Sequence, residues 1–246
     1  MNRVLITGVS GGIGKAVTEQ LISSGISVIG LDLAFKDEIK SMAAKNQGLL
    51  VLQETNLMDI ESLPGVINDI VSKRGPLSGF VHCAGFDKMA PIQLAKIEDI
   101  ENLWKMHALV PMVIIATISK KKNHDDNTSI VLISSQSAHE GAMGHSAYAA
   151  AKGAIEGYLA PAAAELMEKG IRINEVCFAP VKTPMAAEWM NKLDENSMQK
   201  LLGSYPLGIG EVEDASNLIC FLLSHKSRWI NGQIITADGG HSVRKV

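Results

Sequence analysis

The sequence predicts an α/β fold, a single doubly wound parallel sheet of the Rossmann type with helices on both faces. Three observations predict it. Short β-branched runs alternate with helical patterns along the chain. Several of these runs are almost continuously apolar, which is typical of strands buried on both faces of a parallel sheet. A glycine-rich turn joins the first run to the first helical pattern.

The strand candidates are runs rich in Val, Ile and Leu, and the helical patterns fill the intervals between them. The predicted strands are 3–8, 27–32, 49–56, 79–85, 129–135, 171–179 and 233–240. The predicted helices are 12–24, 37–45, 60–73, 96–120, 147–169, 185–202 and 211–224. Asp59 is expected to cap the helix at 60–73, and Gly170 is expected to end the helix before the sixth strand.

Length and charge limit the function classes. With 246 residues and no visible linker or repeat, residues 1–246 are predicted to form one domain. A formal net charge of −3 without a basic stripe argues against nucleic acid as a partner. The basic cluster Lys120–Lys122 is followed at once by His124 and two aspartates, which predicts a solvated helix end and loop.

Cysteine usage and hydropathy favour a cytoplasmic protein. Cys83, Cys177 and Cys220 are odd in number and far apart, so neither a disulfide framework nor a zinc or other metal site is indicated. The N-terminus does not read as a signal peptide. The longest apolar run, 108–118, is too short to span a bilayer, so no membrane partner is expected.

The turn after the first strand carries the first chemical signal. It reads "ITGVSGGIGKAV" over 6–17, with Gly8, Gly12 and Gly14 spaced GxxxGxG. Such glycines let the backbone approach a pyrophosphate, and the following helix N-terminus offers free N–H groups. Asp32 ends the second strand 18 residues after Gly14, where a carboxylate can bind the adenosine ribose hydroxyls. The pattern predicts a dinucleotide site.

Asp32 also bears on which dinucleotide binds. A carboxylate there repels a 2′-phosphate, and the glycine loop has Gly11 where a basic residue would help to bind one. We therefore expect NAD(H) to be favoured, while Lys36 keeps NADP(H) open.

The stretch "SAYAAAKGA" over 146–154 carries the second signal. The run of alanines predicts a helix, which places Tyr148 and Lys152 one turn apart on the same face. A phenol has a pKa near 10, so acid–base work near pH 7 requires that pKa to be lowered by roughly 3 units. The lysine ammonium would favour the phenolate.

With these motifs the chain resembles the classical short-chain dehydrogenases/reductases over nearly its whole length. The resemblance rests on "TGVSGGIG" (7–14), "ISS" (133–135), "YAAAK" (148–152), "IRIN" (171–174) and "INGQIITADGG" (230–240). It implies a nicotinamide cofactor and hydride transfer between that cofactor and a small-molecule carbonyl or secondary alcohol. It also implies a homotetramer or dimer, built partly on the helices at 96–120 and 147–169.

The resemblance assigns roles to residues. Tyr148 would be the general acid/base, Lys152 would lower its pKa and hold the nicotinamide ribose, and Ser135, 13 residues before Tyr148, would bind the substrate oxygen. The implied cofactor-binding residues are Gly8, Ser10, Gly12, Ile13, Gly14, Asp32, Asn56, Leu57, Ala84, Gly85, Tyr148, Lys152, Val181 and Thr183.

The chain departs from the family pattern at a fourth catalytic position. His107 stands where the family usually has an asparagine, whose backbone carbonyl holds a water in the relay to the lysine. Three roles stay open for His107: the same backbone role, a titrating imidazole, or a purely structural histidine.

Other departures surround the cofactor. "HCAG" (82–85) replaces the usual "NNAG", Asn56 replaces an aspartate that commonly meets adenine, and Phe178-Ala179 replaces Pro-Gly. Cys83 is interpreted as a small buried hydrophobic residue rather than a reactive thiol. These changes leave an alternative open, a non-catalytic NAD-binding sensor or structural subunit.

Substrate contacts are expected from three segments, 86–95, 136–146 and 178–205. The last includes a Met-rich stretch, about 183–205, that resembles a substrate lid. Within it Met185, Trp189 and Met190 either line the lid or only pack it on the sheet. The polar segment 136–146 favours a sugar or hydroxy acid, and a β-ketoacyl thioester stays open.

Overall fold

The computed structural model describes residues 2–243, which form a seven-stranded parallel sheet in the order β3-β2-β1-β4-β5-β6-β7. The strands are β1 Arg3–Thr7, β2 Ser27–Asp32, β3 Leu50–Glu54, β4 Leu77–His82, β5 His124–Ser135, β6 Ile171–Phe178 and β7 Ile234–Ala237. The chain runs outward from β1 to β3 and then crosses to β4 on the other side of β1. Crevices for ligands form at such a switch point, at the carboxyl ends of the strands.

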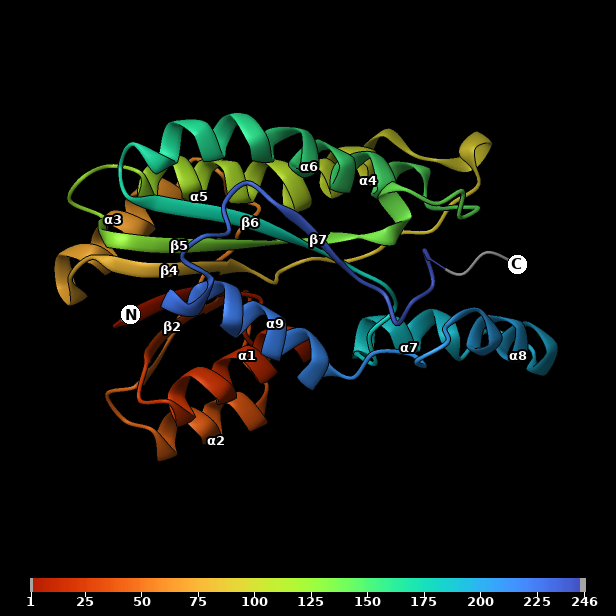
Figure 1. The fold of residues 1–246 in the computed structure, drawn as a ribbon, viewed down its shortest axis with the longest axis horizontal. Coiled ribbons are helices and arrows are strands. Elements are labelled where there is room, and N and C mark those ends of the chain that lie inside the picture. Colours follow the sequence, from red (N-terminus) through yellow and green to blue (C-terminus); the bar gives the residue numbers. More distant parts are fainter. Residues whose placement is uncertain (1, 244–246) are drawn as a thin grey trace.

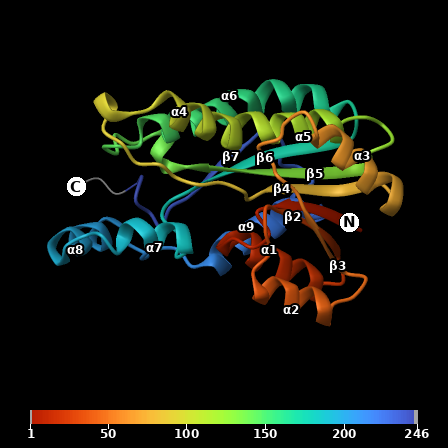
Figure 2. The ribbon, with the colours of Figure 1, turned by 180° about the vertical axis from the view of Figure 1, so that it is seen from behind.

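Helices cover both faces of the sheet, as Figures 1 and 2 show. One face carries α3 (Leu63–Arg74), α4 (Ile97–Trp104), α5 (Val110–Ile118) and α6 (Ser146–Met167). The other carries α1 (Gly12–Ser23), α2 (Asp37–Lys45) and α9 (Val212–Leu223). Beyond the carboxyl ends of the strands lie α7 (Pro184–Met190) and α8 (Glu195–Ser204). Short 3-10 turns occupy η1 Ile92–Leu94, η3 Gln136–Ala138 and η4 His225–Ser227.

The continuous apolar runs of the strands explain the two layers. Alternate side chains of one strand enter opposite cores. On β1, Leu5 packs with the α3, α5 and α6 face, whereas Val4 and Ile6 pack with α1 and α9. All three side chains are fully buried. The predicted doubly wound fold is therefore confirmed.

Most predicted boundaries hold to within a few residues, and two predictions are wrong. Asp59 does not cap the next helix, because α3 begins only at Leu63 with Ser62 before it. Lys120–Lys122 form an exposed turn after α5, as predicted, but β5 begins at His124, which pairs with Leu77, and not at residue 129. Gly170 does end its helix as predicted, with a left-handed φ of +72°.

Two predicted helices are each divided. The segment 96–120 contains α4, the π-helical turn η2 (Lys105–Leu109) and α5 in succession. The segment 185–202 contains α7 and α8, separated by a turn at 191–194. Asp194 causes the second division, because its carboxylate accepts the Ser197 N–H at 2.7 Å and starts a new helix.

No helix within residues 2–243 is long and apolar enough to cross a membrane.

Candidate active site

A cavity of about 770 Å³ opens at the carboxyl ends of the strands. Every residue that the sequence predicts for catalysis or cofactor binding lines it, although these residues come from segments spread over most of the chain. They are Gly8, Ser10, Gly12, Ile13, Gly14, Asp32, Asn56, Leu57, Ala84, Gly85, His107, Ser135, Tyr148, Lys152, Val181 and Thr183. The fold thus brings the predicted site together in one place.

The glycine loop at one end of the cavity has no room for side chains. Gly8 has φ +69°, and a Cβ atom there would lie 2.6 Å from the backbone of Ala84. A Cβ atom on Gly14 would overlap the carbonyl oxygen of Gly8. Close packing of β1, β4 and α1 therefore requires both glycines.

The N-terminus of α1 faces the same cavity. Its N-cap is Gly11, and within the described chain no side chain caps it and no acidic residue stands in the first turn. The free N–H groups and the helix dipole suit an anion. These residues fit the pyrophosphate of a dinucleotide.

Asp32 is held in place beside the glycine loop. Its Oδ2 accepts the Ser10 backbone N–H at 2.9 Å, and its Oδ1 accepts the Leu33 backbone N–H at 2.9 Å. Each carboxylate oxygen can accept a further hydrogen bond, such as one from a ribose hydroxyl. Lys36 lines the same end of the cavity.

Tyr148 and Lys152 lie one turn apart on α6, and Ser135 ends β5. The Lys152 Nζ donates a 2.8 Å hydrogen bond to the Ile133 carbonyl, and it lies 5.6 Å from the centre of the Tyr148 ring. The Ser135 Oγ accepts the Ser137 backbone N–H at 3.2 Å. The three side chains meet at the carboxyl end of β5.

Burial dominates the titration of this group. It lowers the pKa of Lys152 to about 8. It also raises the pKa of Tyr148, as does the Asp87 carboxylate, while the nearby Ser135 hydroxyl acts in the opposite direction. In the protein by itself, loss of solvation of the phenolate is the largest influence on Tyr148, so the lowering of its pKa that proton transfer requires stays a prediction for the site with cofactor bound.

His107 lies in the π-helical turn between α4 and α5, and it is buried. Its Nε2–H donates to the Phe86 carbonyl at 2.7 Å, its ring meets the Tyr148 ring edge-on at 5.0 Å, and its Nδ1 has no partner among the described residues. Burial and the Lys152 charge hold the pKa of His107 well below its usual range. A neutral imidazole near pH 7 counts against the titrating role and leaves the backbone and structural roles.

His82, the first residue of "HCAG", has a positioning role that sequence reasoning missed. Its Nε2 donates to the Met106 carbonyl at 3.0 Å in the π-helical turn. Its Nδ1 therefore accepts from the Thr7 hydroxyl at 2.8 Å, and Thr7 lies opposite His82 in the sheet. Burial and the Lys152 charge lower the pKa of His82 to about 3. The sequence did place His82 at the end of a buried strand, and this was the one sign of its role.

The neighbouring Cys83 is no activated thiol, because burial raises its pKa to about 12.

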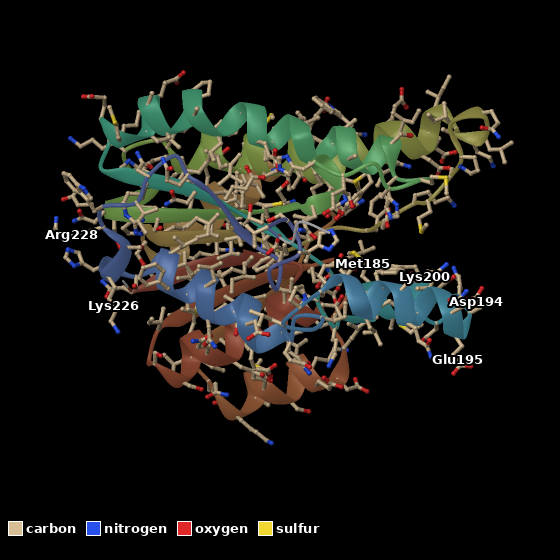
Figure 3. All side chains as sticks on the ribbon, turned by 45° about the vertical axis from the view of Figure 1, so that its right-hand side comes forward. Met185, Asp194, Glu195, Lys200, Lys226 and Arg228 are labelled. Carbon is tan, nitrogen blue, oxygen red and sulfur yellow. The ribbon has the colours of Figure 1, made fainter. Side chains whose placement is uncertain are left out.

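The substrate side of the cavity carries an ion pair. The His145 Nε2 lies 3.0 Å from the Asp87 Oδ2, and both residues line the cavity. The Asp87 carboxylate raises the pKa of His145. Met185 and Trp189 of α7 line the same cavity. In Figure 3, Met185 lies near the body of the molecule, while Asp194 and Glu195 mark the outer end of α8.

Known proteins resemble this chain over nearly its whole length. A family model described as enoyl-(acyl carrier protein) reductase matches residues 8–242. The chain is 32% identical over 245 residues to the 3-oxoacyl-[acyl-carrier-protein] reductase FabG of Thermotoga maritima, covering 96% of both chains. It is 28% identical over 252 residues to the diacetyl reductase [(S)-acetoin forming] of Staphylococcus epidermidis, covering 96% of both.

Solved structures share the fold. The structure titled "ElxO with NADP Bound" superposes with a TM-score of 0.87 at 25% identity, covering 99% of both chains. A short-chain dehydrogenase/reductase of Serratia marcescens superposes with a TM-score of 0.89 at 22% identity, covering 98% of both chains. The chain belongs to the classical short-chain dehydrogenase/reductase family, and it is an oxidoreductase of the NAD(P)-dependent kind.

Proposed function

We propose that this protein is an NAD(H)-preferring oxidoreductase that acts on a carbonyl or secondary alcohol of a small molecule. The observation that carries the proposal is the meeting of Ser135, Tyr148 and Lys152 in one cavity with the uncapped N-terminus of α1. A nicotinamide cofactor, when bound, supplies or accepts the hydride. The protein holds the substrate and moves the proton.

The acid–base work falls to Tyr148. Its raised pKa keeps the proton on the phenol of the free enzyme. For proton transfer to a developing alkoxide that pKa must fall, and the positive charges of Lys152 and of a bound nicotinamide ring would lower it. Ser135 positions the substrate oxygen, and Lys152 stabilises the phenolate that remains. Reduction is proposed as the direction because relatives are named as reductases.

The preference for NAD(H) rests on Asp32. Its two backbone hydrogen bonds fix the carboxylate where a 2′-phosphate would meet negative charge. Lys36 at the same end of the cavity is the feature that would favour NADP(H).

The substrate class follows from the cavity and the relatives. Named relatives reduce 3-oxoacyl thioesters and diacetyl, so we propose a 3-oxoacyl thioester or a small diketone. The Asp87–His145 pair provides polar contacts beside Tyr148. The segment 183–205 is proposed as the lid, because Met185, Trp189 and Leu201 reach the cavity.

A homo-oligomer, a tetramer or dimer, and a cytoplasmic location complete the proposal. Large apolar side chains are exposed along and just before α4, namely Ile92, Leu94, Ile97, Ile100 and Trp104. An apolar patch of this kind suits a subunit interface. The cysteines of the described chain are all unpaired, which suits a reducing compartment.

The test combines cofactor binding and turnover. We would titrate the protein with NADH and NADPH by nicotinamide fluorescence, then follow cofactor oxidation with acetoacetyl thioesters, diacetyl and keto sugars. Tyr148→Phe should abolish turnover and leave NADH binding within about threefold of wild type. Tyr158→Phe, on the same helix, is the matched control and should stay active. Tight binding without turnover of any substrate would favour the non-catalytic alternative, and tighter NADPH binding would overturn the role of Asp32.

A further inference from the structure

We propose a structural zinc site behind the active-site cavity, formed by His139, Glu156 and Cys177. One ligand atom from each residue lies within 4.8 Å of the other two. The residues come from the segment after β5, from α6 and from β6. Because 17 residues or more separate each from the next along the chain, no sequence spacing announces the cluster.

The donor set selects the metal. A cysteine sulfur, an imidazole and a carboxylate together suit Zn²⁺ better than the oxygen-seeking Mg²⁺ or Ca²⁺. Burial and the Glu156 carboxylate raise the pKa of Cys177 to about 12, so the thiol would release its proton when the metal binds. In a tetrahedral zinc site with bonds of about 2.0–2.3 Å, the ligand atoms lie about 3.3–3.8 Å apart. The His139 Nε2 and the Glu156 Oε1 are already 3.0 Å apart, so a contraction of up to about 1 Å concerns the distances to the Cys177 sulfur. The His139 side chain is 53% exposed and has room to move.

Part of the site is already assembled. The His139 Nε2 lies 3.0 Å from the Glu156 Oε1, and the Ser134 hydroxyl donates to that same oxygen at 2.6 Å. Ser134 lies opposite Cys177 in the β5–β6 register. Hydrogen bonds of this kind orient the carboxylate ligands of metal sites.

A buried carboxylate without a partner is the independent observation that points to a cation. Glu175 is fully buried, and neither of its carboxylate oxygens has a hydrogen-bond partner among residues 2–243. It stands two residues before Cys177 on β6, so both side chains enter the same core, beneath α6. A buried, unpaired carboxylate costs free energy, which the Lys152 charge offsets in part and a cation at the cluster would offset further.

The cluster lies outside the active-site cavity, so the role proposed for its metal ion is structural rather than catalytic. None of His139, Glu156 and Cys177 is among the described residues that line the cavity. Glu156 lies one turn beyond Lys152 on α6, and His139 lies four residues beyond Ser135. A bound ion would tie the segment after β5, which also carries His145, to α6 and β6.

The test measures zinc directly on the chain of residues 1–246. After chelator treatment and dialysis against trace Zn²⁺, metal analysis should give one zinc per chain, with affinity read by competition against a chromophoric chelator. Cys177→Ser, His139→Ala and Glu156→Gln should each weaken binding at least about 10–100-fold, the range for losing even an outer partner of a metal site. Cys220→Ser and His225→Ala, a half-buried cysteine and an exposed histidine outside the cluster, are the matched controls and should bind as wild type.

Co²⁺ gives a second readout that does not depend on affinity. Wild type loaded with Co²⁺ should show a thiolate-to-metal charge-transfer band, and Cys177→Ser should lose it. His139→Ala changes an exposed side chain, so it keeps the test valid if the buried serine variant fails to fold. Absence of bound zinc in wild type, or unchanged binding in His139→Ala, would overturn the site.

Discussion

Replacing His82 should remove part of the protein's sensitivity to acid. The folded protein holds the pKa of His82 at about 3, against an ordinary value of 6.5. As the pH falls below 6.5, the unfolded chain takes up a proton that the folded chain refuses, so stability is lost. Between pH 7 and pH 5 this loss is about 2 kcal/mol, and it approaches about 5 kcal/mol below pH 3.

The assay is urea unfolding of wild type and His82→Asn at pH 7 and pH 5. The variant loses the hydrogen bond to Met106, which lowers stability equally at both pH values, so the informative quantity is the difference between them. That difference should shrink by about 2 kcal/mol in His82→Asn.

His145 provides a control of opposite sign. Asp87 raises the pKa of His145, so this residue adds stability that is fully present below pH 6.5 and is lost as the pH rises through the folded pKa. His145→Gln should therefore enlarge the loss between pH 7 and pH 5. If His82→Asn shows the same pH dependence as wild type, His82 is not the buried neutral histidine described above.

Three further predictions concern the cofactor site and the proposed interface. In Gly14→Ala the new methyl group would overlap the Gly8 carbonyl and shift α1, so the affinity for NADH should fall about 100-fold in a fluorescence titration. The control is Gly65→Ala on α3, where a Cβ atom would have no described atom within 4 Å. This variant should raise the free energy of unfolding by up to about 1 kcal/mol, as calorimetry would show. Asp32→Ala should shift the NADH-to-NADPH affinity ratio at least about tenfold towards NADPH, equivalent to about 1.4 kcal/mol, and an unchanged ratio in fluorescence titration would count against the specificity argument. Trp104→Glu should move the protein to a smaller species in light scattering after gel filtration, and an unchanged mass would place the interface elsewhere.

The sequence could predict the strands and the convergence of the site for a physical reason. Apolar runs report burial on both faces, and parallel strands bring their carboxyl ends to one edge. Asp32, Ser135 and Gly8 each follow or end a strand, so their meeting in one cavity was predictable from the order of elements.

The π-helical turn at His107 was not predictable in the same way. The segment 108–118 is apolar on every side, so it has no alternation of polar and apolar faces. A π-helical turn adds one residue to a turn, and only a shift in such an alternation could have revealed it. The charge state of Tyr148 also escaped the sequence. A neighbouring lysine is visible in the pattern, but the cost of burying a phenolate depends on the closed fold around it.

The hydrogen bond between Thr7 and His82 joins residues 75 positions apart. The turn after β1 reaches its final shape only once β4 is in place, because Gly8 packs against the backbone of Cys83 and Ala84. During synthesis, the glycine loop therefore emerges long before the backbone that shapes it. Such distant closure is slow, since chain entropy must be lost before the contacts are gained. Until β4 pairs with it, β1 has an open edge on the side away from β2, and in this period the nascent chain is most exposed to wrong pairing.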